Sequence, residues 1–259
     1  MLFFYRLIIM KSKPIKFQKQ TVNERLVKEA LYTCYENIAF STFPYIHYKL
    51  TSSEKTLDKY NSGNCIALCT FLKKFLKANY KIKSHIIPAS VPSIYRVEGT
   101  PDVCHVALLI PLTTTTYYIV DPAFYFLEPI FAKDFETHTL DSMNIHNKTH
   151  SPIHYQQENN SIRCYYKKED PWFYYLDEVL DPDQSIGCHF IRQKPEPFLC
   201  KTTVLSNGDI YKKYHLKEEK NEFIVIKDHE EVFRGKKENL PESLKRELQI
   251  YLFKYFKSV

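Results

Sequence analysis

Two stretches near the start of the chain space their apolar residues as an amphipathic helix does. In residues 21–40, Thr21 is followed three positions later by Glu24, which is the pattern of a capping box. The apolar residues that follow share one side of the predicted helix: Leu26, Val27, Ala30, Leu31 and Cys34. We therefore expect a helix capped by Thr21 that buries this side.

The second helix is expected in residues 65–80. The polar turn at residues 61–64 leads directly into apolar residues at helical spacing, so Cys65 lies in the first turn. Unpaired N–H groups and the positive end of the helix dipole stabilise a thiolate at that position, which makes the sulfur nucleophilic. Cys65 is therefore the first candidate for chemistry.

After residue 80 the period changes to that of strands. Residues 81–91 alternate, residues 103–112 are almost continuously apolar, and residues 117–120 are β-branched and aromatic. The four threonines at 113–116 connect the last two stretches. This arrangement predicts an antiparallel hairpin.

The remaining elements are less regular. The polar residues 133–162 indicate loop and edge structure, a strand pair is expected from Ile162 to Tyr166, and residues 171–179, which include Trp172, favour a helix or turn. Residues 1–20 are expected to be an irregular lead-in with an edge strand at 2–10.

The C-terminal part alternates again. Ser206-Asn207-Gly208-Asp209 predicts a hairpin turn between strands at 199–205 and 210–216. Residues 222–233 add another strand pair, and residues 240–256 a helix with Pro241 near its first turn.

The order of elements predicts the fold class. Helices come first, strands next and a mixed segment last, without an internal repeat or long linker. This order favours an α+β fold over a doubly wound sheet. We expect an N-terminal helical part at residues 1–80, a central antiparallel β-barrel-like part at 81–170 and a C-terminal α/β lid at 171–259.

Composition narrows the class of protein. A chain of 259 residues with 44% hydrophobic residues buries a full core. The net charge of +6 comes from 36 basic and 30 acidic residues spread along the chain, so no basic patch indicates nucleic-acid binding. The apolar first ten residues are too short to span a bilayer, and no signal cleavage site follows them. We expect a cytoplasmic monomer without nucleic-acid or membrane partners.

Cysteine usage agrees with a reducing compartment. The odd number of cysteines shows no disulfide-framework spacing. These residues are Cys34, Cys65, Cys69, Cys104, Cys164, Cys188 and Cys200. Cys69, one helical turn after Cys65, is interpreted as a buried structural residue.

Three residues on consecutive predicted elements form a candidate catalytic set. Cys65 starts a helix, His105 lies in a strand, and Asp121 ends the next strand. In thiol acyl chemistry an imidazole keeps the thiol deprotonated, and a carboxylate fixes the orientation and tautomer of the ring. Taken one at a time, the three residues are also explained as a buried cysteine, a core histidine and a turn-forming aspartate without any catalytic role. An antiparallel hairpin brings His105 and Asp121 together, and this joint pattern favours the catalytic reading.

The segments that carry these residues resemble the arylamine N-acetyltransferase family and, more broadly, transglutaminase-like and papain-like thiol enzymes. They are G-N-C (63–65), C-H-V-A-L-L-I (104–110) and Y-Y-I-V-D-P-A-F (117–124). N-I-A-F (37–40) and K-P-E-P-F (194–198) resemble further family segments, so the resemblance extends over most of the chain. It implies Cys65, His105 and Asp121 as the catalytic triad.

The resemblance also implies an activity. Such enzymes move an acetyl or other short acyl group from acetyl-CoA to a small amine by a ping-pong mechanism through an acyl-cysteine, without a metal. No motif identifies the residues that bind coenzyme A. Lys201, Lys212 and Lys213 are candidates for its phosphates, although surface lysines are more often simply solvated.

Two alternatives remain open. Family members typically have an arginine and two glycines before the cysteine, then a glutamate and an asparagine, whereas Asn61, Ser62 and Gly63 precede Cys65 here and Ala67 and Cys69 follow it. The missing glutamate and the Asp121-Pro122 pair are compatible with a transglutaminase-like cysteine hydrolase or protease. The altered surroundings of Cys65 are also compatible with a non-catalytic binding module.

The histidines at 138, 146, 150 and 154 have spacings that suggest a metal site. No cysteine or carboxylate pattern accompanies them, so a solvated loop is the better interpretation.

Overall fold

The computed structural model describes residues 22–96, 98–99, 101–145, 148–180 and 197–252. Its helices are α1 (Glu24–Asn37), α2 (Phe43–Ile46), α3 (Ser53–Tyr60), α4 (Cys65–Tyr80) and α6 (Glu242–Leu252), with 3-10 turns η1 (Ser93–Tyr95), η2 (Pro122–Phe124) and η3 (Lys237–Asn239). None of the helices in these ranges is both long and apolar enough to cross a membrane.

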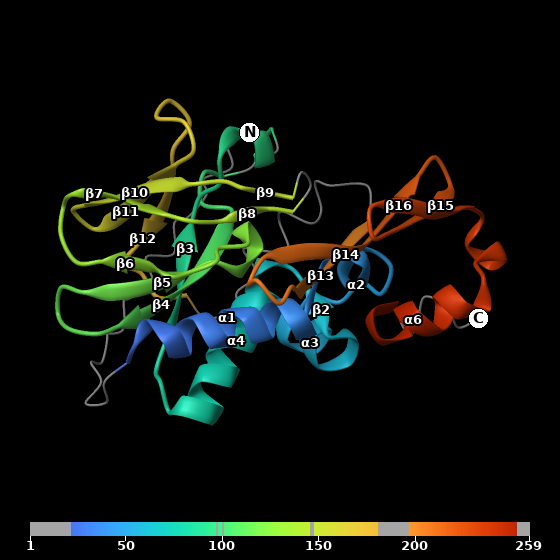
Figure 1. Cartoon of the computed structure of the whole chain (residues 1–259), viewed down its shortest axis with the longest axis horizontal. Coiled ribbons are helices and arrows are strands. Elements are labelled where there is room, and N and C mark those ends of the chain that lie inside the picture. The colour runs from blue at the N-terminus through green and yellow to red at the C-terminus, as the bar shows by residue number, and fades with distance from the viewer. Residues whose placement is uncertain (1–21, 97, 100, 146–147, 181–196, 253–259) are drawn as a thin grey trace, which may run out of the picture.

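The larger sheet has eight strands, and every neighbouring pair is antiparallel. In spatial order they are β6 (Ile130–Ala132), β5 (Tyr117–Val120), β4 (His105–Pro111), β3 (His85–Ala89), β12 (Trp172–Tyr175), β11 (Ser161–Tyr165), β10 (Ile153–Glu158) and β7 (Thr137–Leu140). β6 returns to contact β10, so the sheet curls into a nearly closed barrel-like form (Figure 1).

The second sheet joins the two ends of the described chain. Its six strands are, in spatial order, β16 (Glu230–Gly235), β15 (Glu222–Lys227), β14 (Ile210–Glu219), β13 (Phe198–Val204), β1 (Ala39–Ser41) and β2 (Ser62–Gly63). β1 pairs antiparallel with β13 and parallel with β2, so the C-terminal strands connect through β1 to the segment that precedes Cys65. A short pair, β8 (Met143–Asn144) and β9 (Thr149–His150), stands apart.

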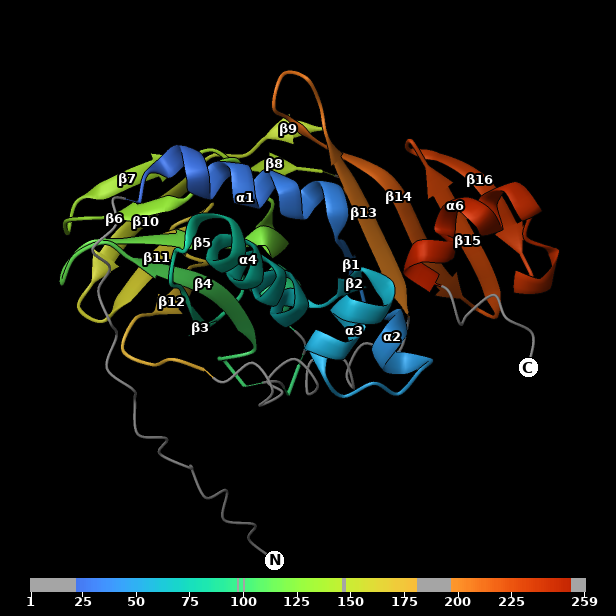
Figure 2. The ribbon, with the colours of Figure 1, turned by 90° about the horizontal axis from the view of Figure 1, so that it is seen from below.

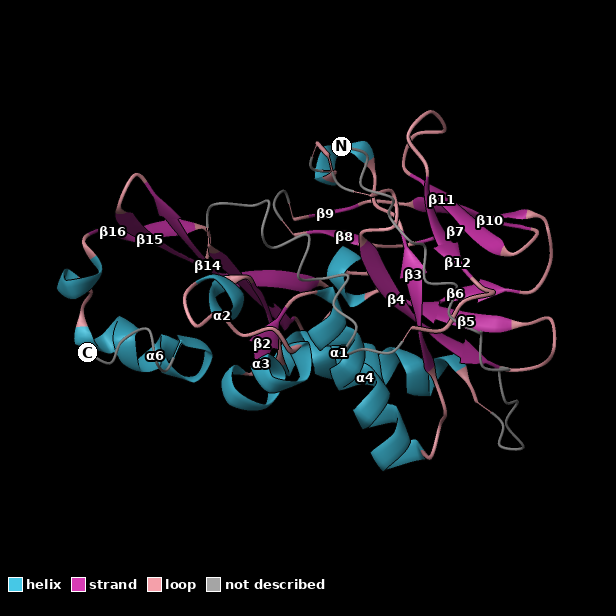
Figure 3. Cartoon of the chain, turned by 180° about the vertical axis from the view of Figure 1, so that it is seen from behind, coloured by secondary structure: helices cyan, strands magenta, loops and turns pink. Residues whose placement is uncertain are grey.

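Helices α1 and α4 pack against each other, and α4 also contacts β4 (Figure 2). Helices α1, α3, α4 and α6 lie along one side of the strands when the molecule is seen from behind (Figure 3). Eight residues of α4 are buried, because its apolar face is pressed between α1 and the sheet. The main core therefore surrounds α4, and a second apolar cluster lies between α6 and the six-stranded sheet.

Most of the predicted elements are confirmed. The α+β class and the barrel-like antiparallel sheet are both present. Helix α4 begins at Cys65, and the β4–β5 hairpin turns at the threonines, with Pro111 opposite Tyr117. The hairpin at Asn207-Gly208 and the pair β15–β16 are also confirmed. The three-part division at residues 80 and 170 stays a prediction.

Three strand regions were predicted wrongly. The first is residues 162–166, where the structure has the single strand β11 in place of the expected strand pair. In residues 133–162, β7 is indeed an edge strand, but β10 pairs on both sides within the sheet. Ile153 and Tyr155 point into the core there and alternate with polar residues. The polar composition of the whole segment therefore masked the two-residue period of a strand. Residues 172–175 form β12 rather than a helix or turn, because Trp172 and Tyr174 alternate into the core.

The cap of α1 was also predicted wrongly. Asn23, with an extended backbone, caps the helix, and its side chain accepts a hydrogen bond from Leu26 N. Asparagine is at least as good a cap as threonine, which explains a start two residues after Thr21. Thr21 lies outside the described residues, as do residues 1–20, His146, Cys188 and residues 253–256.

Candidate active site

The start of α4 places Cys65. Asn61 ends α3 in the left-handed conformation (φ 46°), and two strand residues then lead to Asn64, which caps α4. The Asn64 side-chain oxygen accepts a hydrogen bond from Ala67 N at 3.2 Å. Gly63 is required by close approach, because a Cβ there would lie 2.4 Å from the Ala67 Cβ. Cys65 is therefore the first residue of a helix whose start is closely fixed.

The hairpin β4–β5 brings His105 and Asp121 together. Leu108 pairs with Val120, so the continued register sets Asp121 near Ala107, two residues from His105 on the same face of β4. The His105 Nε2 to Asp121 Oδ2 distance is 2.6 Å, and both side chains are buried. The hairpin predicted from the sequence therefore produces a direct imidazole–carboxylate hydrogen bond.

The Asp121 carboxylate accepts two further hydrogen bonds besides the one with His105. Its Oδ1 accepts from Ala123 N at 3.0 Å, and its Oδ2 also accepts from the Tyr174 hydroxyl at 2.9 Å. The Tyr174 oxygen in turn accepts from Trp172 Nε1 at 3.1 Å. Burial and the charge of Asp121 raise the pKa of Tyr174 well above its ordinary value, so Tyr174 stays a neutral donor. These contacts hold the carboxylate in one orientation.

Cys65 completes the group through His105. Burial alone lowers the pKa of His105, but the charges of Asp121 and Cys65, and hydrogen bonds to both, raise it well above its ordinary value. Since Nε2 bonds Asp121, Nδ1 is the ring nitrogen left for the Cys65 sulfur. The three predicted site residues are thus brought together, with the imidazole of His105 between sulfur and carboxylate.

Aromatic side chains enclose the histidine ring. Phe124 meets His105 edge-on at a centroid distance of 5.3 Å, and Trp172 stacks on Phe124 at 5.2 Å. The exposed fractions of Cys65, His105 and Asp121 are 7%, 5% and 0%. The polar groups of the site therefore interact in surroundings that exclude most water, where their electrostatic interactions are stronger.

Sequence reasoning missed Trp172 and Tyr174 as part of the site. Their segment was predicted as a helix or turn, and in that form they could not share a strand beside Asp121. The alternation of Trp172 and Tyr174 in W-F-Y-Y was the signal available.

Cys69, one turn further along α4, differs from Cys65 in its surroundings. Its sulfur is fully buried and donates to Val106 O at 3.7 Å. Burial raises the pKa of Cys69 well above its ordinary value. Cys69 therefore stays a thiol, in agreement with its structural interpretation. In the part of the chain that the structure describes, all six cysteines are free.

The lysines considered for phosphate binding have unequal surroundings. Lys201 is buried, and its ammonium donates to Tyr35 O at 2.8 Å and to Thr202 O. Lys201 and Lys213 line a hollow of about 320 Å³ between β13, β14 and α6. A larger hollow of about 790 Å³ follows the outer face of α1. None of Cys65, His105 and Asp121 lines either hollow.

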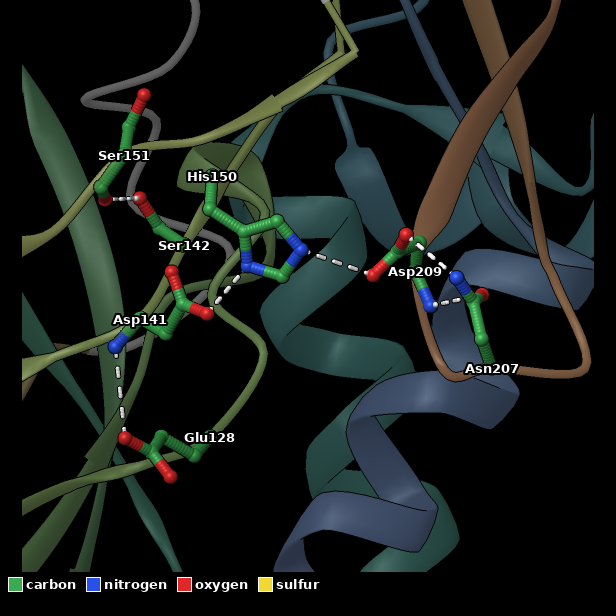
Figure 4. A network of polar contacts seen from close by, with 7 residues as sticks. All are labelled: Glu128, Asp141, Ser142, His150, Ser151, Asn207 and Asp209. Carbon is green, nitrogen blue, oxygen red and sulfur yellow. Dashed lines mark hydrogen bonds and ion pairs between the residues drawn. The ribbon is translucent and has the colours of Figure 1, made fainter.

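The histidines outside the site make local contacts. His138 bonds Asp134 at 2.6 Å, and His154 lies 3.0 Å from the Thr139 hydroxyl. His150 lies between Asp141 and Asp209, with one ring nitrogen toward each carboxylate (Figure 4). Within the described ranges, no group of three or more histidine, cysteine, aspartate or glutamate side chains is arranged to hold a metal ion.

Comparison with solved structures identifies the fold. An arylamine N-acetyltransferase from Bacillus cereus, described as having a Cys-His-Glu catalytic triad, matches with a TM-score of 0.57 at 16% identity, over 89% of this chain and 90% of that one. An arylamine N-acetyltransferase from Bacillus anthracis matches with a TM-score of 0.58 at 13% identity, over 90% and 94%.

A third match is the Mycobacterium marinum arylamine N-acetyltransferase in complex with CoA, with a TM-score of 0.52 at 12% identity, over 91% of this chain and 89% of that one. No protein-family model and no curated protein matches the sequence. The chain therefore has the arylamine N-acetyltransferase fold, and the resemblance inferred from its three motif segments is confirmed at the level of fold.

Proposed function

We propose that this protein is an acyltransferase that moves an acetyl or other short acyl group from coenzyme A to an amine through an acyl-cysteine. The observation that carries the proposal is the buried group in which His105 Nε2 lies 2.6 Å from the Asp121 carboxylate and the neighbouring Cys65 raises the pKa of the ring. The charged ring stabilises a thiolate beside it, and the first turn of α4 adds the positive end of a helix dipole. Cys65 is the proposed nucleophile, His105 the acid and base, and Asp121 the residue that orients the ring.

The proposed reaction has two halves. In the first, the Cys65 thiolate attacks the thioester carbonyl of acetyl-CoA and forms a new carbon–sulfur bond. The bond to the coenzyme A sulfur then breaks, and His105 donates its proton to that leaving group. The Cys65 N–H in the first turn of α4 has no helical carbonyl partner and suits the transient oxyanion, whereas the Ala67 N–H is already bonded to Asn64 Oδ1.

In the second half, an amine attacks the acyl-cysteine carbonyl. His105, now neutral, takes the proton of the attacking nitrogen, and the carbon–sulfur bond breaks to release the amide and restore the imidazolium–thiolate pair. Because Asp121 bonds Nε2, the nitrogen facing the sulfur exchanges the proton in both halves. One ring thus serves a ping-pong cycle without a metal.

Burial of the triad supports aminolysis over hydrolysis. Cys65 is 7% exposed, so an acyl group on its sulfur is sheltered from bulk water until an acceptor enters. The burial of the three side chains favours a transferase over the hydrolase or protease alternative, for which an extended open groove is the expected form. The fold, which recurs in a structure in complex with CoA, supports coenzyme A as the donor. The free cysteines of the described residues suit a cytoplasmic location.

The experiment is incubation with acetyl-CoA followed by intact mass measurement. We expect the mass of one acetyl group to be added to the wild type, and the adduct to disappear on addition of an amine. Cys65→Ala should form no adduct. Cys69→Ala is the matched control, since it removes a sulfur one turn along the same helix, and it should keep the adduct.

Two results would contradict the proposal. The absence of an adduct with every acyl-CoA tested would leave the hydrolase and the non-catalytic module. An adduct that persists in Cys65→Ala would place the chemistry on another residue. Cleavage of a peptide by the wild type but not by His105→Ala would favour the hydrolase.

A further inference from the structure

A buried polar cluster surrounds the start of α4. It is centred on the Tyr45 hydroxyl, whose oxygen lies 2.9 Å from Ser53 Oγ, 3.1 Å from Thr56 Oγ1 and 2.9 Å from Asn64 Oδ1. The same oxygen accepts a hydrogen bond from Asn64 N at 3.1 Å. All four residues are buried. One hydroxyl on α2 therefore connects α3 to the residue that precedes Cys65.

Asn64 is held at two points by this hydroxyl. Its backbone N–H donates to the Tyr45 oxygen, and its side-chain oxygen accepts from Tyr45 while also capping α4 through Ala67 N. Among the described residues, the buried Asn64 Nδ2 has no hydrogen-bond partner. The orientation of the Asn64 side chain is thus set by the hydrogen bonds to its oxygen, from the Tyr45 hydroxyl and from Ser53 Oγ at 2.9 Å.

The neighbouring residues leave no spare space. A Cβ on Gly63 would lie 2.9 Å from the Tyr45 hydroxyl and 2.7 Å from Thr56 Oγ1. Burial raises the pKa of Tyr45 to about 12, although hydrogen bonds with Asn64, Ser53 and Thr56 lower it, and the charge of Cys65 raises it further. Tyr45 is therefore a neutral donor, and it lies close enough to Cys65 for the charge of the sulfur to affect its pKa.

We propose that Tyr45 is a positioning residue for Cys65. Its hydroxyl fixes Asn64, and Asn64 fixes the first turn of α4, on which the sulfur stands opposite His105. Without the hydroxyl, Asn64 N–H is buried without its acceptor, and the first turn shifts to find another. A displacement of about 1 Å at a reacting atom lowers a rate roughly 100-fold. This inference rests on the proposed function only in taking Cys65 as the nucleophile.

The test is the iodoacetamide alkylation rate of Cys65 in Tyr45→Phe, localised by peptide mapping and expressed per folded molecule. Tyr155→Phe is the matched control, because its buried hydroxyl also bonds a carbonyl, Phe131 O at 3.4 Å, but belongs to β10. We expect Tyr45→Phe to react about 10- to 100-fold more slowly than the wild type, and Tyr155→Phe to stay within about twofold. Because this measurement needs no acyl-CoA, wild-type alkylation without acylation would refute the proposed function alone.

A folded Tyr45→Phe protein that reacts at the wild-type rate would overturn the inference, even with a lowered melting temperature, since the hydroxyl would then be only structural. If Tyr45→Phe does not fold, Ser53→Ala replaces it. That variant removes the other side-chain donor to Asn64 Oδ1 and keeps the phenol. We expect it to slow alkylation at least about threefold. An unchanged rate in Ser53→Ala would overturn the inference.

Discussion

Asp121→Asn is the substitution that isolates the role of the carboxylate. It keeps the size of the side chain, but one of the two oxygens becomes an NH₂ group. Oδ1 accepts from Ala123 N, and Oδ2 accepts from His105 and Tyr174, so either orientation of the amide sets a donor against a donor. With the amide nitrogen toward His105, the ring must present a bare Nε2 and carry its proton on Nδ1, facing the sulfur. The base is then in the wrong tautomer.

The magnitude follows from the lost charge. Two unit charges about 4 Å apart interact by about 4 kcal/mol at an effective dielectric constant of about 20. Since about 1.4 kcal/mol corresponds to a factor of ten in rate, losing this stabilisation slows acylation about 1,000-fold. The wrong tautomer raises the expected loss to between about 1,000- and 10,000-fold.

The assay is the single-turnover rate of acyl-cysteine formation, followed by quenched-flow mass measurement. Asp134→Asn is the matched control, because Asp134 also bonds a histidine at 2.6 Å and a backbone N–H two residues ahead at 3.0 Å, but at the surface. Asp134→Asn should react at the wild-type rate. An Asp121→Asn protein that keeps more than about a tenth of the wild-type rate would refute the reasoning, because the ring would then not need the carboxylate.

Three further predictions concern stability. The hydrogen bond and charge of Asp141, and then Asp209, raise the pKa of His150. The contribution of His150 to the free energy of unfolding is therefore present below its ordinary pKa and is lost as pH rises through the folded-state pKa. The loss of stability in His150→Gln, measured by urea unfolding, should be larger near pH 5.5 than near pH 8.5, by no more than about 1 kcal/mol because the ring is exposed; an equal loss at both values would exclude the bridge. Burial lowers the pKa of Lys201 from 10.5 to about 8. Between about pH 8 and pH 10.5 only the unfolded chain holds this proton, so the free energy of unfolding should rise with pH across that range. Lys201→Met should abolish this rise, and a rise that persists would assign it to other groups. Gly63→Ala should destabilise the fold by about 1–3 kcal/mol in chemical unfolding, and the added change Ala67→Gly, which removes the 2.4 Å contact, should restore part of this; no recovery would mean that the overlap is relieved elsewhere.

The sequence predicted the parts of the site that depend on local pattern. A polar turn followed by helical spacing located Cys65 at a helix start, and two apolar stretches around four threonines located the hairpin that joins His105 to Asp121. These features depend on residues close together in the chain, where spacing and turn chemistry decide the structure.

The rest of the site depends on contacts between distant segments. Tyr174 reaches Asp121 across 53 residues, and Tyr45 reaches Asn64 across 19. No periodicity marks such pairs, because each tyrosine reads as an ordinary core residue in its own segment. The burial of Lys201 is of the same kind, since the carbonyl of Tyr35 that accepts its hydrogen bond lies 166 residues away.

The central claim is that the ring of His105 is charged at neutral pH because sulfur and carboxylate hold it from both sides. Nitrogen-15 NMR of the imidazole side chains at neutral pH tests this directly. The account predicts an imidazolium with both ring nitrogens protonated in the wild type, and a reduced pKa for this ring in Cys65→Ala, where one of the two groups that raise it is absent. A neutral His105 ring in the wild type, or one whose titration is the same with and without the Cys65 sulfur, would contradict the account.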